Sequence, residues 1–323
     1  IGISKNNVEF FRKEIYKIPK NIFWEIKKIE IFSEKSEKEN LLSFENNKNG
    51  LFYLIKNDNF YASLMKETSK NRYLKIKSIK NFSFYEKILK EKKYDLVINC
   101  DSNNTLSNKL FAKKINKNYD NIAYTTIFKH KKINNKTATQ IFTKYGPIAF
   151  LPVSNVETSI VCSLDTKIRK YNDIEVLHLI KKHNPKYQIQ SAQKISSFKL
   201  SSSNSRKYYH QNILAFGDLL HRIHPLAGQG FNMTIRDIKI FSEIIQNKID
   251  LGMQLDSSVL YDFEKKTKNR NFLFSNSVDF IYELFNFDKK TKNKSFNNIL
   301  KIVGKSKNFT NFFIKSADKG LNF

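Results

Sequence analysis

Glycine, proline and cysteine are scarce in this chain. Its 323 residues include only 9 Gly, 5 Pro and 2 Cys. Cys100 and Cys162 lie within apolar, strand-like runs and show neither a CxxC motif nor any other paired spacing. We therefore expect two buried thiols in a reducing compartment rather than a disulfide framework.

Long apolar runs are missing as well. No run approaches the roughly 18 apolar residues that a membrane-spanning helix needs, so any membrane contact is expected to be peripheral. The sequence opens IGISKNNVEFF, without Met and without the charged, apolar and small residues of a signal peptide in their usual order. We expect a fragment or processed product with a cytoplasmic location, and a peripheral contact at the inner face of the membrane is left open.

Arginine is rare among the cations. Lys and Arg number 57 against 30 Asp and Glu, which gives a formal net charge of +27. Only seven of the 57 are Arg, whereas proteins that read bases and phosphates favour the planar guanidinium group. The lysines are spread along the whole chain, so we interpret the charge as compositional drift and expect no nucleic acid partner.

Apolar residues make up 40% of the chain, which is enough for a proper core. The run at 94–102 is almost unbroken and is typical of a strand buried in a parallel sheet, whereas strands after Tyr119 alternate as in an antiparallel sheet. These patterns predict a mixed α/β fold in which a second sheet is inserted between pieces of the first. We expect helices over 5–16, 58–70 and 173–183, strands over 26–32, 51–55, 73–79, 94–102, 122–132, 137–153 (with a turn at Gly146), 158–164, 195–200 and 212–216, and helices from there to the C-terminus.

The segment GDLLHRIHPLAGQGFNMTIRD, residues 217–237, contains three of the nine glycines. Glycine serves where the backbone takes a positive φ or lies against a ligand. Asp218 follows a predicted strand and would stand at the carboxyl edge of a sheet, where open α/β folds bind ligands. The backbone from Gly228 to Asn232 would present N–H groups at the start of an amphipathic helix near Phe231. A turn that merely joins strand to helix is the alternative reading of these residues.

His221 and His224 form an HxxH pair within this segment. Two histidines without a further Cys, Asp or Glu at ligand spacing make a poor metal site. We therefore expect no metal.

The residue order in 217–237 resembles the second flavin motif of the ubiquinone-biosynthesis hydroxylases, which are FAD-dependent aromatic monooxygenases with the para-hydroxybenzoate hydroxylase fold. That family's pattern is GDAAHxxHPxAGQGxNxGxRD, and Thr234 stands where the family usually has Gly. Segments 23–32, 140–153, 158–163 and 275–286 resemble further family segments in order. The twelve matching positions are Gly217, Asp218, His221, His224, Pro225, Ala227, Gly228, Gln229, Gly230, Asn232, Arg236 and Asp237.

The resemblance implies three structural regions. These are an FAD-binding Rossmann-like domain (1–25, 56–118 and 196–251), an inserted antiparallel substrate-binding sheet (26–55 and 119–195) and a C-terminal helical region (252–323). It also implies that Asp218 holds the ribityl chain of FAD and that Pro225 lines the flavin face as the catalytic candidate. The cofactor-binding residues implied in this way are Gly217, Asp218, Gly228, Gln229, Gly230, Phe231, Asn232 and Asp101.

The implied activity is hydroxylation of an aromatic ring with FAD, NAD(P)H and O2. The implied substrate is lipid-like, a polyprenylated phenol of ubiquinone biosynthesis. Contact with a membrane surface and with a multi-enzyme biosynthetic complex are left open as further partners. A degenerate, non-catalytic flavoprotein fold that serves as a scaffold in such a complex is the alternative.

The chain departs from the family pattern in three places. The nucleotide-binding GxGxxG and the acidic residue that follows it are absent. In the mid-chain motif DGxxSxxR, Asp101 is retained, but Ser102 and Asn108 replace the Gly and the Arg. Asp58 and Tyr61 replace two arginines of an NRxLR segment, and a missing cation near a pyrophosphate should weaken flavin binding.

Overall fold

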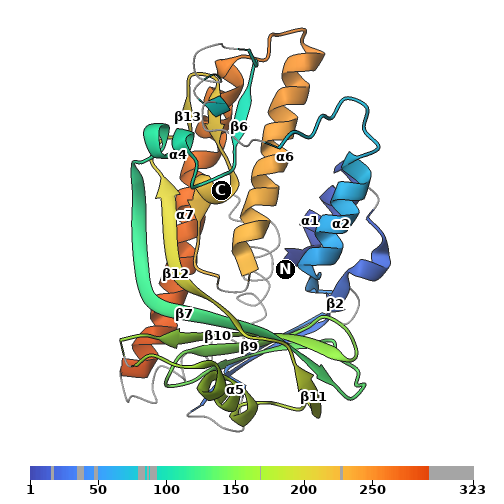
Figure 1. Cartoon of the computed structure of the whole chain (residues 1–323), viewed down its shortest axis with the longest axis vertical. Coiled ribbons are helices and arrows are strands. Elements are labelled where there is room, and N and C mark those ends of the chain that lie inside the picture. The colour runs from blue at the N-terminus through green and yellow to red at the C-terminus, as the bar shows by residue number, and fades with distance from the viewer. Residues whose placement is uncertain are drawn as a thin grey trace. The chain divides into compact units, whose positions relative to one another are not determined.

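The computed structural model describes residues 1–15, 18–34, 40–46, 50–78, 84–85, 87, 93–167, 169–225 and 228–290. The chain divides into two compact units (Figure 1). Unit 1 comprises Ile1–Tyr61, Asn118–Leu200 and Phe280–Phe323, and unit 2 comprises Ala62–Lys117 and Ser201–Asp279.

The predicted domain boundaries do not coincide with the boundaries of these two units. Residues 1–25 are expected in the FAD-binding domain but lie in unit 1, whereas 62–117 and 201–251 of that expected domain lie in unit 2. The assignment of a cofactor role to each region therefore stays a prediction.

Unit 1 is built on the inserted antiparallel sheet that the alternating pattern predicts. Its strands follow the order β7-β10-β9-β8-β3-β4, in which only β3 and β8 pair in parallel, and β11 pairs with β7. Gly146 connects β8 to β9, as predicted, with a φ of 148°. The strands are β3 (Lys28–Ser33), β4 (Leu42–Glu45), β7 (Lys114–His130, which begins in unit 2), β8 (Thr137–Phe142), β9 (Pro147–Pro152), β10 (Glu157–Asp165) and β11 (Ile189–Ala192).

One face of this sheet is covered by helix α5 (Asp173–Lys182), as Figure 1 shows. The helix begins with a capping box between Asn172 and Glu175, so its first N–H groups are satisfied locally. Its apolar side chains, Val176 among them, then pack on fully buried strand residues such as Phe150. This packing fixes the helix on the sheet and gives unit 1 its core.

Unit 1 also contains the beginning of the chain. A small antiparallel sheet is formed by β1 (Gly2–Ser4), β5 (Phe52–Leu54) and β2 (Trp24–Ile26). The predicted first helix is α1 (Lys5–Phe10) followed by a π-helical turn (Phe11–Ile15), and the predicted helix at 58–70 is α2 (Asn57–Thr68), which runs into unit 2.

Unit 2 combines a small sheet with long helices. The sheet has the order β13-β14-β6, and β14 (Ile213–Ala215) pairs in parallel with β6 (Val97–Asn99), as the unbroken apolar run predicts. The core consists of β14 together with apolar side chains of α6 (Gln229–Asp250) and α7 (Ser257–Lys290, whose end lies in unit 1). The remaining elements with residues in unit 2 are α4 (Thr105–Leu110), β12 (Ser196–Ser205), β13 (Tyr209–His210) and β15 (His221–Arg222).

Two expectations from the sequence are wrong. The described part of the expected strand at 73–79, residues 73–78, forms no strand, and Tyr73 is 80% exposed. Alternation predicts a half-buried strand only where another strand pairs with it, and no described strand does so here. Cys162 is buried as expected, but Cys100 is exposed because β6 ends at Asn99, one residue before it.

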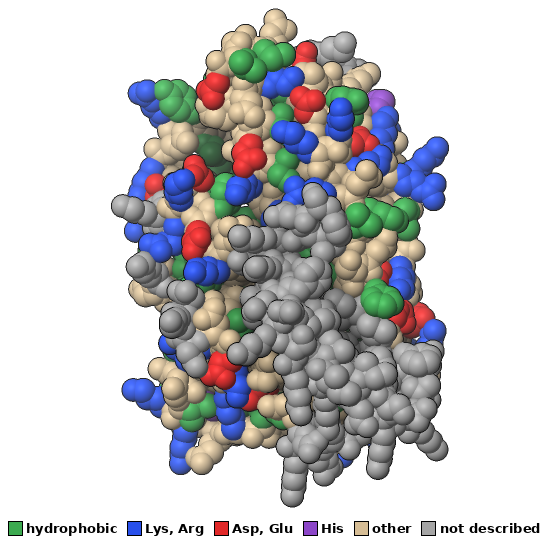
Figure 2. Space-filling model, turned by 180° about the vertical axis from the view of Figure 1, so that it is seen from behind, with side chains coloured by type: hydrophobic (Ala, Val, Ile, Leu, Met, Phe, Trp, Pro, Cys, Tyr) green, Lys and Arg blue, Asp and Glu red, His purple; other side chains and the backbone are tan. Residues whose placement is uncertain are grey.

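Three further expectations concern membrane-spanning helices, the distribution of surface charge and the C-terminal region. None of the helices in the described ranges is both long and apolar enough to cross a bilayer. On the face drawn in Figure 2, the described Lys and Arg side chains lie scattered among acidic and neutral ones. The family-like segment 275–286 falls within α7, as predicted, whereas the C-terminal residues from 291 onward lie outside the described residues.

Candidate functional site

Two adjacent parallel strands of unit 2 bring acidic residues to one edge of the sheet. Asp101 follows β6 and Asp218 follows β14, and Asn99 lies opposite Ala215 in the register. The pairing continues past β14, because Phe216 N donates to Asn99 O at 2.9 Å. The carboxyl ends of parallel strands meet at one edge, which is where open α/β sheets bind ligands. The structure thus places Asp218 at the sheet edge predicted for it, and Asp101 at the same edge.

The turn after β14 requires its glycine for backbone reasons. Gly217 has a φ of 58°, a left-handed conformation that L side chains rarely adopt, and it starts the short 3-10 turn Gly217–Leu219. The turn presents Asp218 outward, with 75% of its side chain exposed and its Oδ2 4.0 Å from Arg222 Nε. Asp218 is therefore accessible to a ligand.

The carboxylate of Asp101 is partly engaged within its own loop. Its Oδ1 accepts a hydrogen bond from Asn103 N at 2.8 Å. Below it, Asn104 caps α4 by accepting from Ser107 N at 2.9 Å and donates to Asn99 Oδ1 at 2.7 Å. This buried network holds the loop between β6 and α4. Ser102, where the family motif has Gly, is half-buried, and Asn108, where it has Arg, is exposed.

Helix α6 begins at a second left-handed glycine. Gly228 has φ 64° and ψ 27°, and no side chain caps the helix at this position. Gly228 N donates to Pro225 O at 3.3 Å, and the side chain of Pro225 is exposed. Gln229 is the first helical residue, and its Oε1 is buried without a hydrogen-bond partner among the described residues. The predicted helix is thus confirmed, and it begins at Gln229, two residues before the predicted start near Phe231.

Gly230 differs from the other glycines of the segment because neither its φ nor the described residues around it require a glycine. It lies within α6 and its φ is not positive. A Cβ added there would meet Ile223 Cγ1 at 3.6 Å, an ordinary van der Waals contact. The chain alone would therefore accept Ala, which is the better helix former. A ligand that lies against the backbone would need a glycine of this kind, and the role of Gly230 in binding one stays a prediction.

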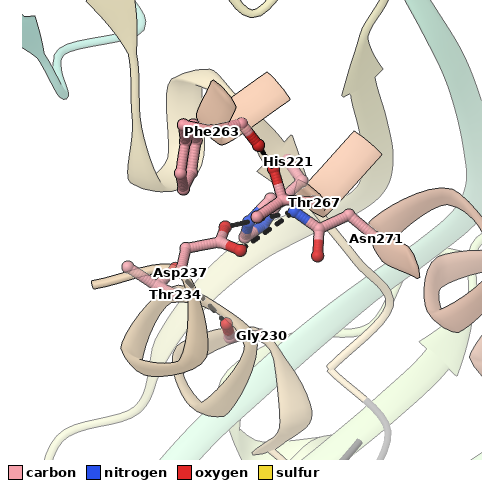
Figure 3. A network of polar contacts seen from close by, with 7 residues as sticks. All are labelled: His221, Gly230, Thr234, Asp237, Phe263, Thr267 and Asn271. Atoms are coloured by element: carbon pink, nitrogen blue, oxygen red, sulfur yellow. Dashed lines mark hydrogen bonds and ion pairs between the residues drawn. The ribbon is translucent and has the colours of Figure 1, made fainter. Parts of the chain in front are cut away.

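A buried polar network joins the two ends of the glycine-containing segment (Figure 3). His221 Nε2 lies 2.5 Å from Asp237 Oδ2, and Asn271 Nδ2 donates to the two oxygens of Asp237 at 3.1 and 3.2 Å. The side chains of His221 and Asp237 are 1% and 2% exposed. Sequence reasoning matched His221 and Asp237 to a family pattern but gave them no role, because nothing in the sequence shows that they pair with each other or with α7.

His224, the second histidine of the HxxH pair, is buried. Burial, and secondarily the charge of Lys117, lower its pKa to about 4, so this imidazole is neutral at physiological pH. His221 is engaged by Asp237, and the described residues contain no group of three or more His, Cys, Asp or Glu that would hold a metal ion. The expectation of no metal stays a prediction.

The substituted positions of the NRxLR segment lie apart from these contacts in sequence. Asp58 and Tyr61 are both exposed on α2. The cations that the family carries there are replaced, and these side chains supply no positive charge to a pyrophosphate.

Known sequences match this chain over large parts of its length. A family profile described as squalene epoxidase matches residues 93–311, more than half of the chain. The 3-demethoxyubiquinol 3-hydroxylase of Escherichia coli (strain K12) is 30% identical over 149 residues, which cover 44% of this chain and 38% of that protein. The ubiquinone biosynthesis monooxygenase COQ6, mitochondrial, of Dictyostelium discoideum is 26% identical over 186 residues, 46% of this chain and 38% of its own length. The chain therefore matches well under half of the length of either relative.

Solved structures share the fold. The crystal structure of p-nitrophenol 4-monooxygenase PnpA from Pseudomonas putida DLL-E4 superposes with a TM-score of 0.71 at 10% identity, covering 98% of this chain and 88% of that one. A geranylgeranyl bacteriochlorophyll reductase-like protein from Thermoplasma acidophilum gives a TM-score of 0.66 at 13% identity, with 98% and 85% covered. The predicted mixed α/β fold is confirmed. The chain belongs to the squalene epoxidase family and is similar in sequence to hydroxylases and monooxygenases of ubiquinone biosynthesis.

Proposed function

We propose that the protein is an FAD-dependent monooxygenase that hydroxylates the aromatic ring of a polyprenylated phenol in ubiquinone biosynthesis, with NAD(P)H and O2 as co-substrates. The observation that carries this proposal is the arrangement of residues 217–237. An exposed carboxylate at the edge of a parallel strand pair is followed by a helix start that no side chain caps. Family membership and the names of the relatives support the chemistry.

The residues present fit a flavin in three respects. Asp218 offers carboxylate oxygens that accept hydrogen bonds from the hydroxyl groups of a ribityl chain. The start of α6 carries the partial positive charge of the helix dipole, which favours the negative charge of a reduced flavin ring. Gly230 leaves room for a ring to approach the backbone, since a methyl group would fit there with only Ile223 in contact.

In this proposal FAD carries out the chemistry, and the protein binds and orients it. Bound FAD supplies the redox chemistry, transferring electrons from NAD(P)H to O2 for hydroxylation of the ring. Asp218 and the backbone from Gly228 to Asn232 bind and orient it, and Asp101 supports the same sheet edge. Pro225, exposed in the loop before α6, lines the face on which substrate binds. A lipid-like phenol as substrate would bring the protein to a membrane surface or into a biosynthetic complex.

One observation favours a second candidate, a non-catalytic scaffold with the same fold. Asp58 and Tyr61 supply no cation where the family carries two, and Asn108 replaces a further Arg. The purified full-length gene product decides between the two. Bound FAD, seen by its visible absorbance, together with NAD(P)H oxidation that depends on a polyprenylated phenol, would exclude the scaffold. A colourless protein that added FAD does not reconstitute would exclude the enzyme.

Asp218→Ala tests the placement of the site. We expect it to abolish flavin retention while the far-UV circular dichroism spectrum stays that of the wild type, because an exposed side chain is removed. Glu243→Ala, an exposed acidic position on α6, is the matched control and should retain flavin. Unchanged flavin content in Asp218→Ala would show that the cofactor lies elsewhere.

A further inference from the structure

The His221–Asp237–Asn271 network has a defined hydrogen-bond polarity. Asn271 Nδ2 donates to the two carboxylate oxygens of Asp237, so both oxygens act as acceptors. His221 Nε2 must then be the donor to Oδ2, which places a proton on Nε2. His221 Nδ1 is buried and has no hydrogen-bond partner among the described residues. Asp237 therefore fixes both the orientation and the tautomer of the imidazole.

The network links elements that carry the proposed cofactor contacts. His221 lies in β15 immediately before the loop with Pro225 and Gly228, and Asp237 lies in α6 after it. A second bond supports the same region, because Asn204, the strand partner of His221, donates through Nδ2 to Ser275 Oγ at 2.9 Å. Both ends of the 222–236 segment are thus tied to each other and, through Asn271, to α7 (Figure 3).

A buried, charge-assisted hydrogen bond is a poor source of net stability. The cost of removing a charged group from water offsets much of its attraction to its partner, and apolar side chains of equal volume often stabilise a fold as well or better. In some proteins a buried polar group instead selects one arrangement among several. The His221–Asp237–Asn271 network links β15 to α6 and α7, so it is placed to select one arrangement of these elements.

We propose that the His221–Asp237–Asn271 network is a positioning device, which holds β15 and the start of α6 in the arrangement that binds the cofactor. This inference rests on the proposed function. If the network is weakened, the binding-competent conformation becomes a smaller fraction of the folded molecules, and the apparent dissociation constant rises by the inverse of that fraction.

Asp237→Asn is the decisive variant. Its amide oxygen still accepts from Asn271, but its amide nitrogen now donates to His221 Nε2, which moves the imidazole proton to Nδ1 and replaces a charge-assisted bond by a neutral one. We expect the dissociation constant for FAD, measured by fluorescence titration, to rise about tenfold. The visible circular dichroism of flavin at saturation should also change, since it reports how the ring is held.

Thr267→Val is the matched control. Thr267 lies one turn before Asn271 on α7, is fully buried, and donates to Phe263 O at 2.7 Å (Figure 3). Its loss should lower the melting temperature as a buried hydrogen bond does, while affinity and flavin spectrum stay those of the wild type. The inference is overturned if Asp237→Asn behaves in the same way.

A second variant keeps the test open if Asp237→Asn does not fold. Asn271→Leu removes the two bonds from α7 and leaves the His221–Asp237 pair, so a smaller rise in the dissociation constant is expected in a folded protein. An affinity equal to that of Thr267→Val would contradict the inference. Failure of the proposed function looks different, because the wild-type protein itself would then bind no FAD.

Discussion

The two units use their rare residues differently. In unit 1, Gly146 has no room for a side chain, because a Cβ would stand 1.7 Å from Ser163 O. In unit 2, Gly230 has room, because among the described residues Ile223 alone lies near the position of a Cβ. The first glycine is required by the packing of the sheet. The second has no such packing reason among the described residues, which fits the proposed role of a ligand beside it.

Buried histidines show the same contrast. His130 of unit 1 has partners for both ring nitrogens, Lys131 O at 2.9 Å and Thr158 Oγ1 at 3.0 Å. Tyr187 donates to Asn135 Oδ1, and Asn135 Nδ2 donates to Thr158 Oγ1, which closes the cluster. His221 of unit 2, in contrast, leaves Nδ1 without a partner among the described residues. The two histidines thus differ in how completely their ring nitrogens are bonded within the described residues.

The largest expected effect tests the glycine of unit 1. Gly146→Ala places a methyl group on a backbone carbonyl at a φ of 148°, so we expect the free energy of unfolding to fall by about 4 kcal/mol. Urea denaturation followed by circular dichroism measures the change. Gly2→Ala, whose Cβ would have nearest contacts at 3.7 Å, is the control within unit 1 and should stay within about 1 kcal/mol. Equal stability of the two variants would remove the contrast.

The second largest expected effect is a loss of folding stability at low pH, which arises from His224 of unit 2. Burial, followed by the charge of Lys117, lowers its pKa from 6.5 to about 4 in the folded protein. Between these values the unfolded chain binds a proton and the folded one does not, so stability is full above pH 6.5 and falls as the pH drops toward 4. The loss amounts to about 3 kcal/mol.

His224→Gln measures this contribution directly. Urea midpoints at pH 7, 5.5 and 4.5 should fall less steeply in the variant than in the wild type, because the glutamine does not titrate. His178→Gln, at an exposed position of α5, should leave the slope unchanged. A wild-type slope in His224→Gln would mean that this imidazole is protonated equally in both states.

The sequence predicted most of the scaffold, but not the contacts that hold residues 217–237 in place. Hydrophobic periodicity is local, so it located β10 and α5, and residue order located the segment from Gly217 to Asp237. The same local reasoning failed at residues 73–78, where the outcome depends on whether another strand pairs with them. It also missed Asn271, which is 34 residues from the carboxylate it contacts. Such pairings arise from tertiary packing, which no local pattern encodes.

The smallest expected effect on stability is the most informative about the ligand. Gly230→Ala should change the free energy of unfolding by less than about 1 kcal/mol, toward greater stability, because Ala suits a helix and the new methyl group has space. Its dissociation constant for FAD should nevertheless rise, since that methyl group occupies the place where the ring would approach the backbone. Gly252→Ala is the matched control, because Gly252 has a φ of 67° beyond the end of α6 and its replacement should cost about 1 kcal/mol without touching affinity. If Gly230→Ala binds FAD as tightly as the wild type, Gly230 has no ligand-related role, and the contrast between the glycines of the two units does not extend to function.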